Sequence, residues 1–171
     1  MAGELKGGKV TVDDPAEASA LHNRGSYGEP LSGGGLVLSL MEAVYLVETG
    51  RLDIRREGAE LPTRSLFRTA AAAYDQFEIR YVVYRDLRQR GYVVVEGAGP
   101  PDFLVYPRGG TPKRTPAKFW AAAISERAVF DADALTDQPA DRLVGKDGGV
   151  GRVEDRAPVV LHEVQQDHQP G

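Results

Sequence analysis

A change of hydrophobic period at Gly91 constrains this chain more than any other feature of its sequence. Before Gly91, apolar side chains recur at helical spacing, which predicts a helix over residues 74–90 that ends at this glycine. The helix dipole favours positive charge near the C-terminal end, which is where the sequence has Arg85, Arg88 and Arg90. After Gly91, apolar residues form short runs that predict strands, at 92–95, 102–106, 118–125 and 159–164. A helix followed by such strands predicts an α/β domain.

The N-terminal half of the chain carries local signals of its own. A short alternating run at 9–12 predicts a strand in a small, β-rich start. Ser39 and Glu42 form a capping-box pattern, and Gly50 stands where a helix commonly ends. We therefore predict a helix over 40–49, whose broad apolar stripe must be buried.

These patterns predict two parts in the chain. Residues 1–70 are expected to form a small α+β domain and residues 71–166 an α/β domain. A short helix is expected near residues 131–144, and residues 167–171 read as a polar tail.

The composition restricts the classes of function. The formal net charge is −4, so nothing drives the whole chain toward nucleic acid, and an RNA contact requires a local basic patch or a partner chain. No apolar stretch of about 18 residues is present, which argues against a membrane-spanning helix. The chain has no cysteine and its acidic N-terminus is unlike a signal peptide, so a cytoplasmic protein without thiolate metal sites is expected.

Patterns typical of cofactors are incomplete in this sequence. Residues 97–99 (GAG) follow a strand as a dinucleotide-binding loop does, but two prolines come next, where a helix must begin. We therefore predict a plain turn. His22, His162 and His168 lack the spacing of a metal pair on one helix face, so neither a metal nor a cofactor is expected.

Asp102 and Lys118 supply part of a pattern found in metal-dependent nucleases. In the complete pattern, PD…(D/E)xK, two acids hold the divalent ion and the lysine stabilises the attacking water or the phosphate. Here Pro116 takes the place of the second acid. One carboxylate is a poor magnesium site, because that ion requires several oxygen ligands.

A resemblance to a known family rests on four segments: 36–50 (LVLSLMEAVYLVETG), 81–94 (YVVYRDLRQRGYVV), 102–107 (DFLVYP) and 21–28 (LHNRGSYG). Together they resemble the archaeal tRNA-splicing endonuclease family, over roughly residues 8–125. The resemblance implies a restriction-endonuclease-like α/β C-terminal domain with a mixed central sheet. It also implies removal of introns from precursor tRNA at bulge-helix-bulge sites without a metal.

The resemblance implies general acid–base catalysis by a tyrosine, a histidine and a lysine, which leaves a 2′,3′-cyclic phosphate. Tyr106 matches the tyrosine, and Lys146 matches the lysine in an ungapped comparison. Pro116 stands at the histidine position and has no proton to transfer. No histidine occurs between His22 and His162, so a shift of register restores none. We therefore expect a structural, non-catalytic subunit.

The resemblance also implies partners: a catalytic subunit, in a heterotetramer of two plus two chains, and precursor tRNA. In such assemblies edge strands near the C-terminus pair between chains, and an acidic loop docks into a basic pocket of the neighbour. The matching loop positions are Glu154 and Asp155. The matching strand positions are Val159, Val160, Leu161, His162, Glu163 and Val164.

Two alternatives to a structural subunit stay open. In the first, the chain is itself a nuclease that uses Tyr106 and Lys146, or a metal held near Asp102 and Lys118. In the second, it is an RNA-binding module whose basic stretch contacts phosphates. That stretch comprises Arg108, Lys113, Arg114 and Lys118, which we interpret as a solvated loop with occasional RNA contact.

Overall fold

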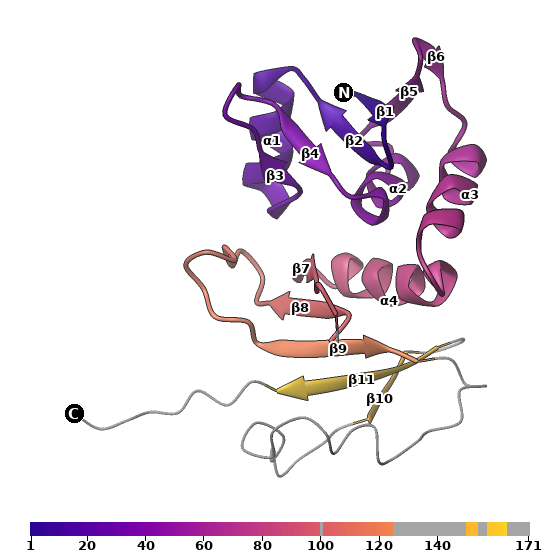
Figure 1. The fold of residues 1–171 in the computed structure, drawn as a ribbon. Helices are drawn as coiled ribbons and strands as arrows, with labels where there is room; N and C mark the ends of the chain where they lie inside the picture. The colour runs from indigo at the N-terminus through magenta and orange to yellow at the C-terminus, as the bar shows by residue number, and fades with distance from the viewer. Residues whose placement is uncertain (100, 125–149, 154–156, 164–171) are drawn as a thin grey trace. The chain divides into compact units, whose positions relative to one another are not determined.

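The computed structural model describes residues 1–99, 101–124, 150–153 and 157–163, and for the last two segments it describes the backbone alone. Contacts divide the chain into an N-terminal unit, Met1–Tyr81, and a C-terminal unit, Val82–Gly171. Each unit has its own sheet (Figure 1). Within the described residues, no helix combines the length and the apolar character that crossing a membrane requires.

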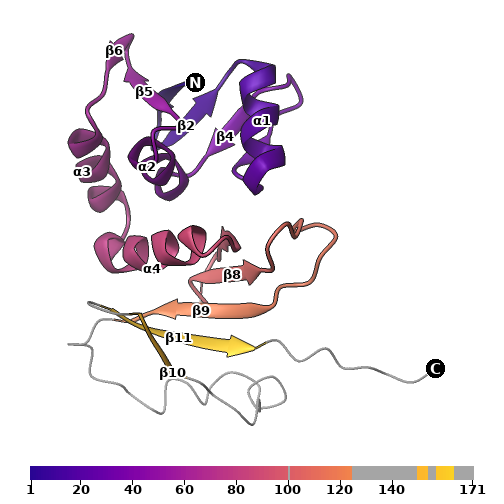
Figure 2. The ribbon, with the colours of Figure 1, turned by 180° about the vertical axis from the view of Figure 1, so that it is seen from behind.

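The N-terminal unit is built around a six-stranded sheet. Its elements are, in chain order, β1 (Ala2–Lys6), β2 (Lys9–Val12), α1 (Pro15–Gly25), β3 (Glu29–Pro30), β4 (Leu36–Leu38), α2 (Leu40–Glu48), β5 (Asp53–Arg56), β6 (Ala59–Glu60) and α3 (Thr63–Ala73). The strand order is β3-β4-β2-β1-β5-β6, with β1 and β5 parallel and the other neighbours antiparallel. Both α1 and α2 contact β2 and β4, and Figure 2 shows these helices beside the sheet from behind.

Helix α2 is the element that local sequence specifies best, and its predicted range is confirmed. The Ser39 hydroxyl accepts from the amide of Glu42 (3.2 Å), and the Glu42 carboxylate accepts from the amide of Ser39 (3.0 Å), which completes the capping box. The other Glu42 oxygen accepts from the Gly28 amide (2.9 Å), so the cap also holds the preceding loop. The predicted apolar stripe is buried, through Leu40, Met41, Ala43, Val44, Tyr45 and Leu46.

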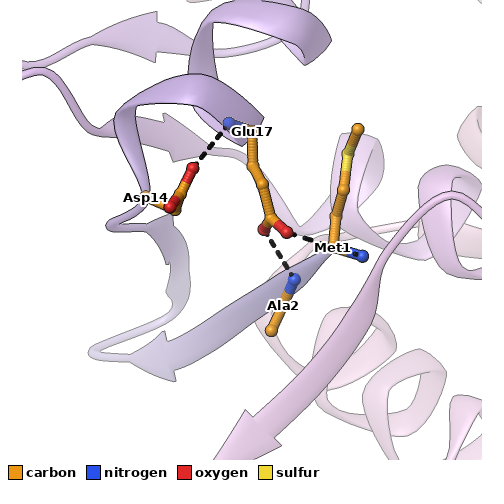
Figure 3. A network of polar contacts seen from close by, with 4 residues as sticks. All are labelled: Met1, Ala2, Asp14 and Glu17. Atoms are coloured by element: carbon orange, nitrogen blue, oxygen red, sulfur yellow. Dashed lines mark hydrogen bonds and ion pairs between the residues drawn. The ribbon is translucent and has the colours of Figure 1, made fainter.

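Helix α1 was not expected in what the sequence presents as a β-rich start. Its N-cap is Asp14, whose side chain accepts from the Glu17 amide (2.8 Å), and a proline follows at the first turn. The Glu17 carboxylate in turn accepts from the Ala2 amide of β1 (3.0 Å) and lies 3.9 Å from the terminal amine of Met1 (Figure 3). One short acidic segment therefore starts the helix and ties it to the first strand.

The C-terminal unit carries a five-stranded sheet. The chain enters it through α4 (Phe77–Gln89) and continues with β7 (Val93–Glu96), β8 (Phe103–Tyr106), β9 (Phe119–Ala123), β10 (Val150–Val153) and β11 (Ala157–Glu163). The four predicted strands are thus confirmed as β7, β8, β9 and β11, and so is the α/β class. The predicted helix at 131–144 and the tail at 167–171 lie outside the described residues.

One feature of the predicted C-terminal sheet differs in the structure. We expected mixed pairing there, but its described pairs are antiparallel, in the order β10-β11-β9-β8-β7. The short connection between β7 and β8 reverses the chain, whereas a parallel pair needs a longer crossover. The parallel pairing lies instead in the N-terminal sheet, where the chain passes through two helices between β1 and β5.

Helix α4 begins three residues later than the sequence predicts. Tyr74 is extended, with φ −119° and ψ 131°, and ends α3, while Gln76 has a positive φ of 51°. Within the C-terminal unit, Tyr84 packs against Phe103 of β8 with ring centroids 5.9 Å apart, and both rings are fully buried. This contact joins the helix to the sheet.

Arg88, which the sequence predicts near the C-terminal end of this helix, lies inside the core. Only 6% of its surface is exposed. Its Nε donates to the Tyr84 hydroxyl and its Nη2 donates to the Val94 carbonyl of β7, each at 3.0 Å. The guanidinium also lies 5.3 Å from the Tyr84 ring centroid. A charged side chain therefore links α4 to β7, which lies at one end of the strand order.

Candidate functional site

The end of β8 and the start of β9 form the place where the sequence predicts chemistry. Val105 pairs with Phe119, and the Lys118 amide donates to the Val105 carbonyl (2.7 Å). Because the two strands are antiparallel, this register brings Tyr106 to the same end of the pair as residues 116–118. The structure thus places two of the three predicted positions at one end of one strand pair. The third, Lys146, lies outside the described residues.

The groups present at this end differ from an acid–base set. Tyr106 is buried, with 7% of its surface exposed. Pro116 is exposed and offers no ionisable group, and Lys118 is exposed with its ammonium 5.0 Å from the Phe119 ring centroid. An acid–base cleavage needs one group that removes the 2′ proton and another that protonates the leaving oxygen. The described residues of this end supply one buried phenol and one ammonium, and no imidazole.

The histidines lie elsewhere. The Nδ1 of His22 donates to the Tyr27 carbonyl at 3.0 Å, within the N-terminal unit. His162 lies on β11, where its backbone pairs with Trp120 of β9, and His168 falls outside the described residues. The described contact of His22 thus belongs to the turn that follows α1.

The alternative metal site is not assembled around Asp102. One carboxylate oxygen of Asp102 accepts from the Ala123 amide at 2.8 Å, so this side chain fixes the far end of β9. In the register of β8 with β9, Lys118 lies opposite Tyr106, four residues further along β8 than Asp102, which corresponds to roughly 13 Å. Across the part of the chain that the structure describes, no group of three or more acidic, histidine or cysteine side chains is placed to hold a metal ion.

The glycine segment at 97–99 is part of a turn between two antiparallel strands, as predicted. The Gly97 amide donates to the Asp102 carbonyl (2.8 Å), and β7 and β8 pair across the turn. A Cβ at Gly97 would lie 2.1 Å from the Pro101 carbonyl oxygen, so the position needs glycine. No helix begins here to receive a phosphate, because β8 starts at Phe103.

The predicted basic stretch lies in the connection from β8 to β9, residues 107–118, which we call the basic loop. Its basic residues Arg108, Lys113, Arg114 and Lys118 are all exposed. Arg108 is also structural, since its Nε donates to the Arg90 carbonyl at 2.8 Å beside Gly91. The basic loop therefore contacts the turn between α4 and β7.

The predicted subunit interface is described only in part. Residues Val159 to Glu163 do lie on a strand, β11, whereas Glu154, Asp155 and Val164 fall outside the described residues. The resemblance implies an edge strand here, but β11 has β9 on one side and pairs along Ala157–Val160 with β10 on the other. A role of these positions in binding a partner chain stays a prediction.

An aromatic contact that the sequence did not predict lies beside the basic loop. Tyr92 and Phe119 are half-buried and meet edge to face, with ring centroids 6.2 Å apart. Tyr92 directly follows the helix-ending Gly91, and Phe119 follows Lys118 in the sequence. An aromatic residue next to a basic one was the available signal, but only the sheet pairing brings these two together.

Comparisons with known proteins extend over both units. Residues 1–67 match the family model described as tRNA intron endonuclease, N-terminal domain, and residues 77–140 match tRNA intron endonuclease, catalytic C-terminal domain. A tRNA-splicing endonuclease of Methanosarcina mazei is 37% identical over 163 residues, which are 95% of this chain and 45% of that protein. The chain thus spans about half the length of this relative.

Two shorter relatives are covered more completely. A tRNA-splicing endonuclease of Thermococcus onnurineus is 39% identical over 134 residues, or 78% of this chain and 76% of that protein. One of Sulfurisphaera tokodaii is 32% identical over 146 residues, or 79% of this chain and 80% of that protein. The similarity therefore covers at least about three quarters of each of these relatives.

Proposed function

The chain belongs to the tRNA intron endonuclease family, and from that premise we propose that it is a structural, non-catalytic subunit of a tRNA-splicing endonuclease. In this role it pairs with catalytic chains, two plus two, and positions them on precursor tRNA. The family membership supplies the substrate class. The non-catalytic role is inferred from the residues that stand at the predicted catalytic positions, Pro116 and Tyr106.

The observation that carries the proposal is Pro116. It stands at the exposed start of the segment that leads into β9, at the end of the strand pair that holds Tyr106. A general acid or base at this place typically contributes about 10²- to 10⁴-fold to the rate. Proline cannot donate or accept a proton, so the chain lacks that contribution.

The burial of Tyr106 supports the same conclusion. A phenol that acts on a ribose hydroxyl must come within hydrogen-bonding distance of it, about 3 Å. Tyr106 has 7% of its surface exposed, so an RNA strand has little access to it without rearrangement of this unit. Its place on β8, opposite Val93 of β7, gives it a packing role instead.

The description of residues 77–140 as a catalytic domain favours a second candidate, in which the chain cleaves RNA with Tyr106 and Lys146. The two candidates differ in what the chain does alone. A non-catalytic subunit does not cleave precursor tRNA by itself but is required for cleavage by the complex. A catalytic subunit cleaves precursor tRNA by itself.

The test is cleavage of an intron-containing precursor tRNA, with a chelator present, by this chain alone, by a family member that carries tyrosine, histidine and lysine, and by the mixture. We expect cleavage by the mixture and, for this chain alone, a rate lower by at least about 10²-fold. Cleavage by this chain alone, at a rate close to that of the mixture, would overturn the proposal.

A matched variant separates scaffolding from chemistry inside the complex. Tyr106→Phe removes one hydroxyl oxygen and keeps the ring that packs in β8. We expect the mixture to cleave with this variant at an unchanged rate, provided that its melting temperature is also unchanged. A loss of about 10²-fold or more at unchanged stability would place Tyr106 in the chemistry and favour the second candidate.

A further inference from the structure

One short part of this acidic chain carries basic residues without any acidic residue among them. Between residues 103 and 125 the sequence has four basic residues and no acidic residue, although the net charge of the chain is −4. All four lie in the basic loop and are exposed. Such a local patch is what an acidic protein needs if it contacts a polyanion.

Hydrogen bonds within the basic loop give it a defined shape. The amides of Arg114 and Thr115 both donate to the Thr111 carbonyl at 2.8 Å, and the Thr111 amide donates to the Thr115 hydroxyl at 3.0 Å. These bonds form a compact turn with Lys113 and Arg114 on its exposed part. A loop that is already ordered loses less conformational entropy when it binds a ligand.

Both ends of the basic loop are fixed, one to the sheet and the other to the turn after α4. The Lys118 amide donates to the Val105 carbonyl (2.7 Å), and the Arg108 side chain donates to the Arg90 carbonyl (2.8 Å). By contrast, the structure shows no hydrogen bond or ion pair within the described residues for the side chains of Lys113 and Arg114. These two charges are therefore available to a ligand.

The surroundings of Lys118 favour RNA over an acidic peptide. Its ammonium lies 5.0 Å from the Phe119 ring centroid, and the half-buried Tyr92 ring meets Phe119 edge to face. Basic side chains that follow a phosphate backbone, next to aromatic rings on which unpaired bases stack, are typical of surfaces that bind single-stranded or bulged RNA.

We propose that the basic loop binds the phosphate backbone of precursor tRNA, so that this chain contacts the RNA directly as well as positioning its partners. The inference rests on the proposed function, because it takes the substrate class from there. Lys113 and Arg114 supply charge without reading sequence, and the contact is therefore the same for precursor and mature tRNA.

The experiment measures binding of precursor tRNA to the full-length chain, alone and in the mixture with a catalytic chain, over a series of salt concentrations. The variant carries Lys113→Ala and Arg114→Ala. Two controls accompany it: Lys113→Arg with Arg114→Lys, which keeps both charges, and Arg64→Ala with Arg68→Ala, which removes two exposed charges from α3. Melting temperatures confirm that each variant folds.

We expect the loop variant to bind about tenfold more weakly near 0.1 M salt, and both controls to bind like the unaltered chain. The slope of log affinity against log salt should fall in magnitude by about 1.8 for duplex contacts, or about 1.4 for single-stranded ones. Mature tRNA should lose affinity by the same factor.

Three results would overturn the inference. One is an unchanged affinity and salt slope in the loop variant; another is an equal loss in the α3 control, which would indicate a nonspecific effect of charge. The third is unchanged RNA binding together with loss of association with the catalytic chain, which would assign the loop to a protein partner. None of these depends on whether this chain cleaves RNA, so failure here is distinguishable from failure of the architectural role.

Discussion

Replacing Arg88 with alanine should destabilise the C-terminal unit by about 3 to 5 kcal/mol. The side chain is 6% exposed and donates two described hydrogen bonds, to the Tyr84 hydroxyl and to the Val94 carbonyl. Hydrogen bonds from a charged donor contribute roughly 1.5 to 3 kcal/mol each, and truncation leaves the carbonyl of β7 without this partner in a buried place. The free energy of unfolding of a domain is commonly only about 5 to 15 kcal/mol, so the loss is a large share.

The chain provides its own probe for this measurement. Its single tryptophan, Trp120, lies on β9 of the same sheet, so tryptophan fluorescence during urea unfolding reports on the unit that contains Arg88. With a denaturant slope of about 2 kcal/mol per molar, a loss of 3 kcal/mol lowers the urea midpoint by about 1.5 M. Arg88→Lys keeps the charge but not the planar fork of donors, so we expect an intermediate loss.

Arg90→Ala, directly after the same helix, is the matched control. Arg90 pairs with Asp86 at 2.8 Å, but their side chains are 54% and 23% exposed, and such a surface pair contributes only about 0.3 to 0.5 kcal/mol. If the Arg88 and Arg90 variants unfold within about 1 kcal/mol of each other, the reasoning about the buried guanidinium is refuted.

Further substitutions test the two helix caps and the glycine after α4. The measurement is again urea unfolding, here monitored by circular dichroism. Ser39→Ala removes the hydroxyl that caps α2 and should cost about 1 kcal/mol, and an unchanged midpoint would contradict the capping box. Asp14→Ala should cost a similar amount at α1, whereas Asp14→Ser should restore most of it. Gly91→Ala forces a side chain into a backbone with φ of 87° and places a Cβ 3.2 Å from the Arg108 Nε, so it should cost at least about 1 kcal/mol. A neutral result there would mean that the turn after α4 relaxes freely.

The elements predicted well are those whose signals lie within a few residues of one another. The capping box of α2 spans Ser39 to Glu42, and its helix follows as predicted. The strands after Gly91 follow from short apolar runs in the same way. Helix α1 has an equally local signal, Asp14 with Glu17 three residues later, so its start also can be predicted from the sequence.

Which chemical groups are available follows from the residues alone: Pro116 cannot transfer a proton, and no histidine between His22 and His162 replaces it. Where the remaining groups lie depends on how distant segments pair and pack in the folded chain. The pairing of β8 with β9 holds Asp102 four residues from Lys118 along the strands. Tyr106 is buried, and Arg88 is held in the core by its hydrogen bonds to Tyr84 of α4 and Val94 of β7. The physical reason is that side-chain chemistry belongs to single residues, whereas burial and juxtaposition arise from pairing between segments distant along the chain, whose register no local pattern specifies.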